Sequence, residues 1–149
     1  IITMLLEEKL SIKAITVMIQ KEAADRLSTP VGSRDSGAIT VCTNYYAEVK
    51  HLFNVSRGSF MPPPNVDSTV IKLEIRPEPA VKVSDEKKFF RMVKAAFAQR
   101  RKTAVNSIAS GMGLSKNQVA EALGKSGLDV NVRAEKLTME ELAALSENL

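Results

Sequence analysis

Residues 60–68 are Phe-Met-Pro-Pro-Pro-Asn-Val-Asp-Ser, and this stretch limits how the rest of the chain can fold. Its consecutive prolines fix their φ angles and remove backbone donors, so the stretch can be neither a helix interior nor a central strand. It must be a stiff loop. Phe60, at its head, either fills the core or is held ready to present its ring to a flat ligand.

The segments on both sides of this loop have the pattern of strands. Residues 49–55 contain β-branched and aromatic residues with imperfect alternation. Residues 71–75 alternate cleanly between apolar and charged, which predicts a strand with one solvated face near a sheet edge. The proline loop is therefore expected to join two strands.

Toward the N-terminus the pattern predicts alternating helices and strands. Residues 1–10 have the character of the end of an amphipathic helix. The apolar run 15–19 is typical of a strand buried on both faces of a mainly parallel sheet, with polar residues 20–22 at its carboxyl end, where such sheets bind ligands. Residues 23–27 predict a short helix. Residues 38–46 fit a helix by apolar spacing and a strand by composition, and we favour the helix.

The second half of the chain is expected to be helical. Residues 76–83 have the proline-rich composition of a linker. From Ser84, the expected N-cap, an amphipathic helical pattern continues as far as Ile108. Capping boxes at Ser115 and Thr138 predict two more helices. We expect a truncated domain in residues 1–76, a linker in 77–84 and a helical domain in 85–149.

Composition excludes several classes of protein. The chain has 149 residues, 44% of them hydrophobic and 26% charged, which is typical of a globular protein. No apolar run approaches the roughly 20 residues of a membrane span. The single Cys42 and single His51 exclude an internal disulfide and a multi-cysteine or paired-histidine metal site. With no signal peptide recognisable, we expect a reducing, cytoplasmic location.

Positive charge is concentrated in one segment. Residues 85–102 hold seven basic and two acidic residues, out of 21 and 17 in the whole chain, so this segment carries the entire excess. The basic residues are Lys87, Lys88, Arg91, Lys94, Arg100, Arg101 and Lys102. Such concentration predicts a polyanionic partner, although a merely solvated helix face is the alternative. The helical pattern places Arg100 on the apolar side, where it must pair with a carboxylate or point into a groove between the domains.

Four motifs occur in the order and spacing of a known family. They are residues 20–26 (Gln-Lys-Glu-Ala-Ala-Asp-Arg), the loop 60–68, residues 97–103 (Phe-Ala-Gln-Arg-Arg-Lys-Thr) with Asn106, and residues 133–137 (Arg-Ala-Glu-Lys-Leu). Together they resemble the small-subunit ribosomal RNA adenine dimethyltransferases, the Ksg or dimethyladenosine transferase family, over nearly the whole chain. The resemblance implies an α/β plus α fold, the C-terminal part of a Rossmann-like class I methyltransferase sheet followed by a small all-helical domain.

The resemblance also implies a reaction and its residues. The family uses S-adenosylmethionine to dimethylate two adjacent adenines of small-subunit ribosomal RNA during ribosome biogenesis. Phe60 would stack on the flipped-out target adenine, and Pro62, Pro63 and Pro64 would keep its loop rigid. The residues expected to hold RNA phosphates are Lys87, Arg91, Lys94, Arg100, Arg101 and Lys102.

Several family features do not occur in this sequence. Neither the glycine-rich cofactor turn nor the Asn-Leu-Pro-Tyr catalytic motif is found, and the chain begins with Ile1 rather than Met. We therefore expect a fragment that binds no S-adenosylmethionine and no metal, is catalytically inactive, and can pair with a neighbour through an exposed sheet edge. Ser36 and Ser56 stand where the family usually has tyrosine and proline.

Two other functions remain open on the sequence. The first is a non-catalytic RNA-binding, ribosome-assembly or transcription-factor-like module of the same family. The second is kinship with the antibiotic-resistance methyltransferases of large-subunit RNA, which share the proline loop. The run at residues 99–103 points away from the second.

Overall fold

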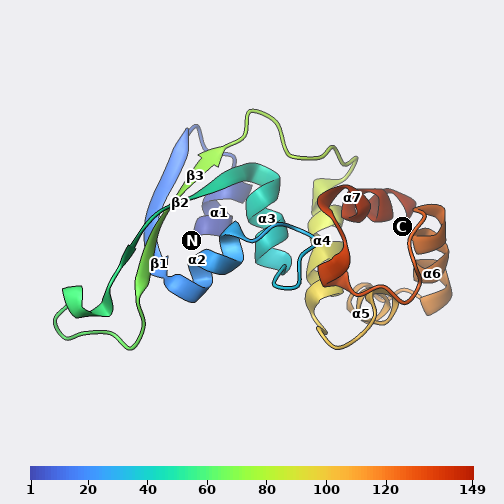
Figure 1. The fold of residues 1–149 in the computed structure, drawn as a ribbon. Coiled ribbons are helices and arrows are strands. Elements are labelled where there is room, and N and C mark those ends of the chain that lie inside the picture. Colours follow the sequence, from blue (N-terminus) through green and yellow to red (C-terminus); the bar gives the residue numbers. More distant parts are fainter.

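A computed structural model describes all 149 residues. The first half contains α1 (Ile2–Glu7), β1 (Ala14–Gln20), α2 (Lys21–Ser28), α3 (Ala38–Tyr46), β2 (Ala47–Val55), the 3-10 turn η1 (Arg57–Ser59) and β3 (Ser68–Ile75). The second half contains α4 (Glu86–Phe97), α5 (Ala104–Met112), α6 (Lys116–Lys125), the 3-10 turn η2 (Ala134–Lys136) and α7 (Met139–Asn148). Figure 1 shows the sheet at the left with α1, α2 and α3 against one of its faces, and the group of α4 to α7 beyond α3 on that same side.

The sheet has three strands in the order β1-β3-β2, and β3 runs antiparallel to both neighbours. The expectation that residues 71–75 lie near an edge is therefore wrong, because β3 is central. Its alternation has another cause: Ile71 and Leu73 are fully buried on the face that packs against helices, whereas the opposite face is partly solvated. A central strand of a sheet covered on one face alternates just as an edge strand does.

The expectation for residues 15–19 is also wrong. β1 is an edge strand, paired only with β3 in antiparallel register from Ala14–Glu74 to Gln20–Ser68. Within it Ile15 alone is buried, and Met18 is 50% exposed. The apolar run thus has neither the parallel neighbour nor the second covering layer that its composition suits.

The short helices of the first half agree with the sequence pattern. The helices predicted at residues 23–27 and 38–46 are α2 and α3. α3 passes directly into β2, because its C-cap Ala47 already has extended dihedral angles. β2 carries an irregularity of register between His51 and Phe53. Together α2 and α3 cover one face of the sheet (Figure 1).

No helix or strand occupies residues 76–85, yet this segment is fixed to the first half at two points. The backbone N–H of Arg76 donates to the Tyr46 carbonyl at 2.9 Å, and that of Ala80 donates to the Tyr45 carbonyl at 3.0 Å. α4 then begins one residue later than expected. Asp85, not Ser84, is the N-cap, because the Asp85 carboxylate accepts from the Lys88 N–H at 3.0 Å.

The helical pattern that continues as far as Ile108 is two helices, not one. α4 ends at Phe97, and Thr103 caps α5 by accepting from the Asn106 N–H. A side chain that accepts a hydrogen bond from a backbone N–H in this way caps the start of a new helix, so the preceding helix does not continue through it. The capping boxes expected at Ser115 and Thr138 are confirmed at the starts of α6 and α7.

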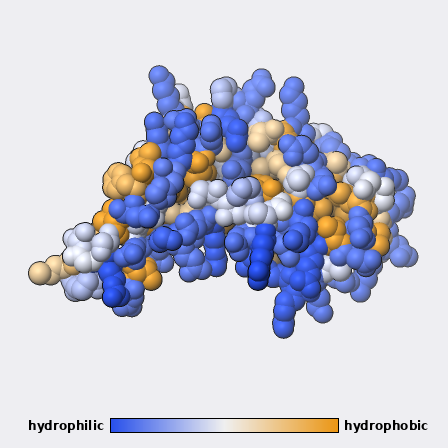
Figure 2. Space-filling model, viewed as in Figure 1, coloured by the Kyte–Doolittle hydropathy of each residue, from blue (hydrophilic) through white to orange (hydrophobic).

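An aromatic cluster joins the two halves of the molecule. Tyr45 and Tyr46 of α3 meet Phe89 and Phe90 of α4, with ring centroids between 5.0 and 5.6 Å apart across the two helices. These contacts merge the buried residues of both halves into one core. The visible surface is mainly hydrophilic, with apolar areas at the sheet end and the helical end (Figure 2). None of the helices combines the length and the apolar character required to span a membrane.

Candidate functional site

The loop between β2 and β3 extends well beyond the helices that cover the sheet (Figure 1). Asp67 fastens its base: the Asp67 carboxylate accepts from the Arg57 N–H at 2.8 Å, and its carbonyl accepts from the Lys21 N–H at 3.0 Å. The three prolines at positions 62–64 are exposed. The loop is thus stiff at its centre and held at its base.

Phe60 is half-buried and belongs neither to the buried core nor to the partly buried residues packed against it. Its N–H donates to the Arg57 carbonyl at 3.3 Å, which closes η1. The next side chain, Met61, is 99% exposed. Nothing in the pattern of residues 60–68 distinguishes a methionine that packs from one that projects. The loop therefore presents an aromatic and an apolar side chain outside the core.

A polar hollow of about 420 Å³ lies at the base of this loop. Its wall includes Gln20, the last residue of β1, and the two residues that follow it, together with Arg57 and Asp67. The polar residues 20–22 do therefore line a hollow at the carboxyl end of their strand, as expected.

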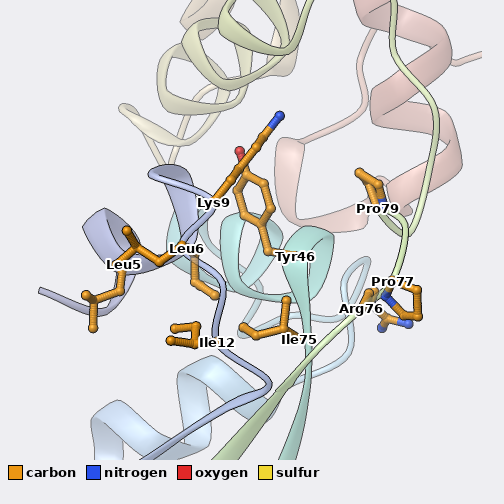
Figure 3. A pocket seen from close by; sticks show the side chains of 10 residues that line it. Leu5, Leu6, Lys9, Ile12, Tyr46, Ile75, Arg76, Pro77 and Pro79 are labelled. Atoms are coloured by element: carbon orange, nitrogen blue, oxygen red, sulfur yellow. The ribbon is translucent and has the colours of Figure 1, made fainter.

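A second hollow of about 240 Å³ lies between α1, the end of β3 and the start of the linker that follows β3. Leu5, Leu6 and Ile12 line one side, and Arg76 and two prolines line the other (Figure 3). The Tyr46 ring stands at its top beside the Lys9 side chain (Figure 3). The walls are mainly apolar and no pair of acidic and basic groups converges there, so we assign no chemistry to this hollow.

The six basic residues expected to hold RNA phosphates are exposed and lie on α4 and the turn that follows it. Lys87, Arg91 and Lys94 lie on the exposed face of α4, and residues 100–102 form the turn before α5. None of them makes an ion pair with a carboxylate. Their positive charge is therefore left uncompensated by direct partners.

Arg100 is not on a helix, so its expected place on the apolar side of one is wrong. It is exposed, and its Nη2 donates to the Arg34 carbonyl at 3.4 Å, across the gap between the two halves. Of the two environments expected for Arg100, the structure shows the groove between the two halves, and Arg100 pairs with no carboxylate. The reason is that α4 ends at Phe97, so the helical periodicity that predicted the position of Arg100 does not extend to it.

The basic face of α4 borders a groove made of two adjoining hollows, which share Lys94 and Ala98. One, of about 660 Å³, has Lys87, Phe90 and Arg91 in its wall. The other, of about 300 Å³, lies between residues 35–40 and the end of α4. We call the two together the α3–α4 groove.

Glu86, the first residue of α4, is joined to α3 and to the turn after α1 at one end of this groove. Its carboxylate accepts from the hydroxyls of Tyr45, at 3.2 Å, and Tyr46, and it lies 3.5 Å from the Lys9 ammonium. Burial, followed by the charge of Glu86, raises the pKa of Tyr45 to about 12. Burial and the hydrogen bond to Glu86 raise the pKa of Tyr46 as well. Both phenols therefore remain neutral donors. Sequence reasoning missed Glu86, since its partners lie some 40 residues away.

The geometry suits binding of an anion better than proton-transfer chemistry. Burial, followed by the charge of Glu7, raises the pKa of the Cys42 thiol to about 11, so it is not an activated nucleophile. No group of three or more His, Cys, Asp and Glu side chains could hold a metal ion. What the surface offers is free positive charge, a groove beside it and a projecting aromatic loop.

Comparisons with known proteins agree with this picture. The profile of the family described as ribosomal RNA adenine dimethylase matches residues 1–149. The chain is 45% identical over 152 residues to the ribosomal RNA small subunit methyltransferase A of Bacillus licheniformis, covering 100% of this chain and 52% of that protein. It is 45% identical over 150 residues to the protein of the same name from Alkaliphilus oremlandii, with the same coverage. The chain spans about half the length of these relatives.

Two solved structures share the fold. A dimethyladenosine transferase from Plasmodium falciparum superposes with a TM-score of 0.75 at 21% identity, over 95% of this chain and 59% of that one. The 23S rRNA methyltransferase ErmE superposes with a TM-score of 0.66 at 24% identity, over 99% of this chain and 59% of that one. The fold is thus that of part of a Rossmann-like methyltransferase, with a helical group attached.

Proposed function

The chain belongs to the ribosomal RNA adenine dimethylase family, and from this premise we propose that it serves the S-adenosylmethionine-dependent dimethylation of two adjacent adenines in small-subunit ribosomal RNA. The observation that carries the proposal is the unpaired basic face of α4 beside the α3–α4 groove, on a fold shared with dimethyladenosine transferases. Ribosomal RNA, within the immature small subunit, is the proposed partner. This dimethylation would be one step of ribosome biogenesis.

Phe60 is proposed to stack on the target adenine after the base leaves its helix. A base must be unstacked before its edge can be modified, and an aromatic face replaces part of the lost stacking. Support comes from the position of Phe60 outside the core, on a loop held by Asp67 at its base. Pro62, Pro63 and Pro64 would restrict this loop, so less conformational entropy is lost on binding.

The phosphates of the RNA are proposed to lie along α4 and its following turn. The proposed contacts are Lys87, Arg91, Lys94, Arg100, Arg101 and Lys102. All six are exposed and free of carboxylate partners. A basic surface without internal ion pairs binds a polyanion without first breaking an ion pair.

The cofactor does not fit the residues of this chain. A glycine-rich cofactor turn follows a strand, whereas the glycines with positive φ here, Gly32, Gly113 and Gly127, all follow helices. The hollow at the carboxyl end of β1 is lined by polar side chains and a single hydrophobic residue, so it offers no apolar slot for an adenine ring. We propose that this chain alone neither binds S-adenosylmethionine nor transfers methyl groups, and that its share of the reaction is to hold the RNA.

This poor fit favours one alternative function, a non-catalytic RNA-binding or ribosome-assembly module. The two functions differ in one measurement on the whole gene product: transfer of a labelled methyl group from S-adenosylmethionine to a small-subunit ribosomal RNA hairpin with adjacent adenines. Incorporation of about four methyl groups per hairpin, two on each adenine, supports the enzyme. Binding of the hairpin without incorporation would establish the module instead.

The free edge of β1 is proposed to pair with a further strand. Residues 14–20 contain no charged side chain and no bulge, so nothing on this edge opposes pairing. β2, at the other edge, has Glu48 and Lys50 and an irregular register, all of which discourage pairing. In the isolated chain a second copy would take this place. Sedimentation should then show concentration-dependent dimers that Met18→Lys weakens, and a monomer at all concentrations would refute the pairing.

The division of the chain is likewise a proposal. We assign residues 1–76 to the methyltransferase part, residues 77–84 to the linker and residues 85–149 to the RNA-binding helical domain. The absence of helix or strand between Ile75 and Glu86 supports this division. A cytoplasmic location, where ribosomal RNA is modified, is proposed on the same basis as the substrate.

A further inference from the structure

The start of α3 is an open, uncapped helix N-terminus facing the smaller hollow of the α3–α4 groove. Gly37, its N-cap, has no side chain to satisfy the first turn, and its own N–H donates to the Thr40 hydroxyl at 3.0 Å. The next two N–H groups, of Ala38 and Ile39, have no acceptor in the protein. A Cβ built on Gly37 would meet no atom within 4 Å, so the backbone here can be approached closely.

Ser36, immediately before this helix, provides an independent sign of a missing partner. Its side chain is 1% exposed, and its Oγ has no hydrogen-bond partner. It is the one buried side-chain oxygen or nitrogen of the chain in this state, and Ser36 lines the same hollow. A buried hydroxyl is normally paired, so an unpaired one beside free N–H groups points to a ligand that accepts from all of them.

The charges around the hollow identify the ligand as an anion. Lys94 and Arg100 stand in the opposite wall without carboxylate partners, and Arg26 lines it while paired to Glu22 at 2.9 Å. One carboxylate, Asp35, also lines the hollow and opposes them. The two unpaired cations outweigh it. The volume of about 300 Å³ is ample for a phosphate group.

We propose that the Ser36 hydroxyl, the first N–H groups of α3 and the Arg100 guanidinium together hold one backbone phosphate of the bound RNA. The anion site follows from the geometry alone, whereas the RNA as its source rests on the proposed function. The hollow continues through Lys94 into the larger one, along the basic face of α4. The phosphate at α3 would then be the end of a row that follows α4, and it would fix the strand relative to the sheet as well as to the helical group.

The test fills the hollow without touching a charged residue. Gly37 has φ −145° and ψ 177°, extended angles that any residue adopts, so Gly37→Leu places a side chain in the open space without backbone strain. Gly124→Leu on α6 is the matched control, because a Cβ there also meets nothing within 4 Å. Ser36→Ala removes the hydroxyl alone. Thermal unfolding of each variant establishes that it is folded.

Two titrations are followed by the amide signals of Ala38 and Ile39 in ¹⁵N–¹H NMR spectra, one with inorganic phosphate and one with the ribosomal RNA hairpin. We expect both ligands to shift these two amides in the unsubstituted chain and in Gly124→Leu. Gly37→Leu should abolish the shifts and weaken hairpin binding by about tenfold, as expected for the loss of charge-assisted hydrogen bonds. Ser36→Ala should weaken it by a smaller factor.

The outcomes separate the phosphate site from the proposed function. If Gly37→Leu binds the hairpin with unchanged affinity, and the hairpin does not shift the two amides of the unsubstituted chain, the phosphate site is refuted and RNA binding by α4 still stands. Shifts with inorganic phosphate but no binding of the hairpin support the anion site and contradict RNA as its source. If neither ligand shifts the amide signals of Ala38 and Ile39, the anion site is refuted.

Discussion

The Tyr46 hydroxyl donates a hydrogen bond to the Glu86 carboxylate, so the last residue of α3 is joined to the first residue of α4. The neighbouring Tyr45 hydroxyl donates to the same carboxylate at 3.2 Å. Both bonds cross between the sheet half and the helical half. They fix the width of the α3–α4 groove at the end where Glu86 and Phe90 line it.

Replacing Glu86 should loosen this connection. Glu86→Gln removes the charge that both phenols donate to, and hydrogen bonds to charged groups are worth more than neutral ones. We expect the free energy of unfolding to fall by about 1–2 kcal/mol in urea titrations. Glu140→Gln, in the first turn of α7 and without an ion pair, is the matched control and should change it by less than about 0.5 kcal/mol. Equal stabilities for the two variants would contradict the joining role.

Stability should fall above pH 9. The folded-state pKa values are raised, for Cys42 from 9.0 to about 11 and for Tyr45 from 10.0 to about 12, chiefly by burial. Below the unfolded pKa values both groups are protonated in both states, and their contribution to stability is complete. As pH rises, the unfolded chain loses these protons first, so the contribution is lost progressively up to the folded pKa values.

Urea unfolding midpoints measured from pH 7 to pH 12 test this dependence. The midpoint should start to decline near pH 9, and Cys42→Ala should move the onset toward pH 10, where tyrosine titrates in the unfolded chain. A midpoint that stays constant through pH 11 would show that neither group is perturbed as described.

Gly111 should not tolerate a methyl group. It lies on α5 against Ala95 of α4, and a Cβ built on it would lie 2.6 Å from the Ala95 Cβ. Gly111→Ala gains about 1 kcal/mol of helix propensity, but the overpacking forces the two helices apart at a cost of about 1–3 kcal/mol. We expect net destabilisation of about 1 kcal/mol by thermal or urea unfolding. Gly124→Ala, in open space on α6, should instead be stabilising; a gain in both would show that α4 and α5 are not in close contact.

Phe60 should contribute to RNA binding through its ring. Stacking of a base on an aromatic side chain is worth about 1–3 kcal/mol, so Phe60→Ala should raise the dissociation constant for the hairpin by about tenfold or more. Phe53→Ala is the control, because Phe53 is a more exposed phenylalanine, at 55%, that lies on β2 rather than in the loop. An equal effect of the two changes in a filter-binding assay would argue against a stacking role.

The local periodicity of the sequence was enough to predict most of the elements, but not which of them are neighbours. Residues 38–46 form a helix because apolar side chains three and four apart face the sheet, and this local signal was visible. The central position of β3 was not visible, since a central strand covered on one face alternates like an edge strand.

The site was predictable to the same degree. The basic residues and the proline loop are consecutive stretches, and they lie exposed on the molecule as stretches of this kind usually do. The place of Arg100 was missed because the Thr103 cap ends one helix and starts another within an unbroken apolar pattern. Glu86 and Ser36 were missed because their significance depends on α3 and α4 meeting in space.

The central claim is that α4 and the turn after it bind ribosomal RNA through its phosphates, and the salt dependence of hairpin binding tests it most directly. The logarithm of the association constant should fall linearly with the logarithm of salt concentration, by about 0.7–0.9 per phosphate contacted, or several units in all. Lys94→Gln should reduce this slope by about one unit, whereas Lys116→Gln, an exposed lysine at the start of α6, should leave it unchanged. A flat salt response, or the same slope in all three proteins, would contradict the account.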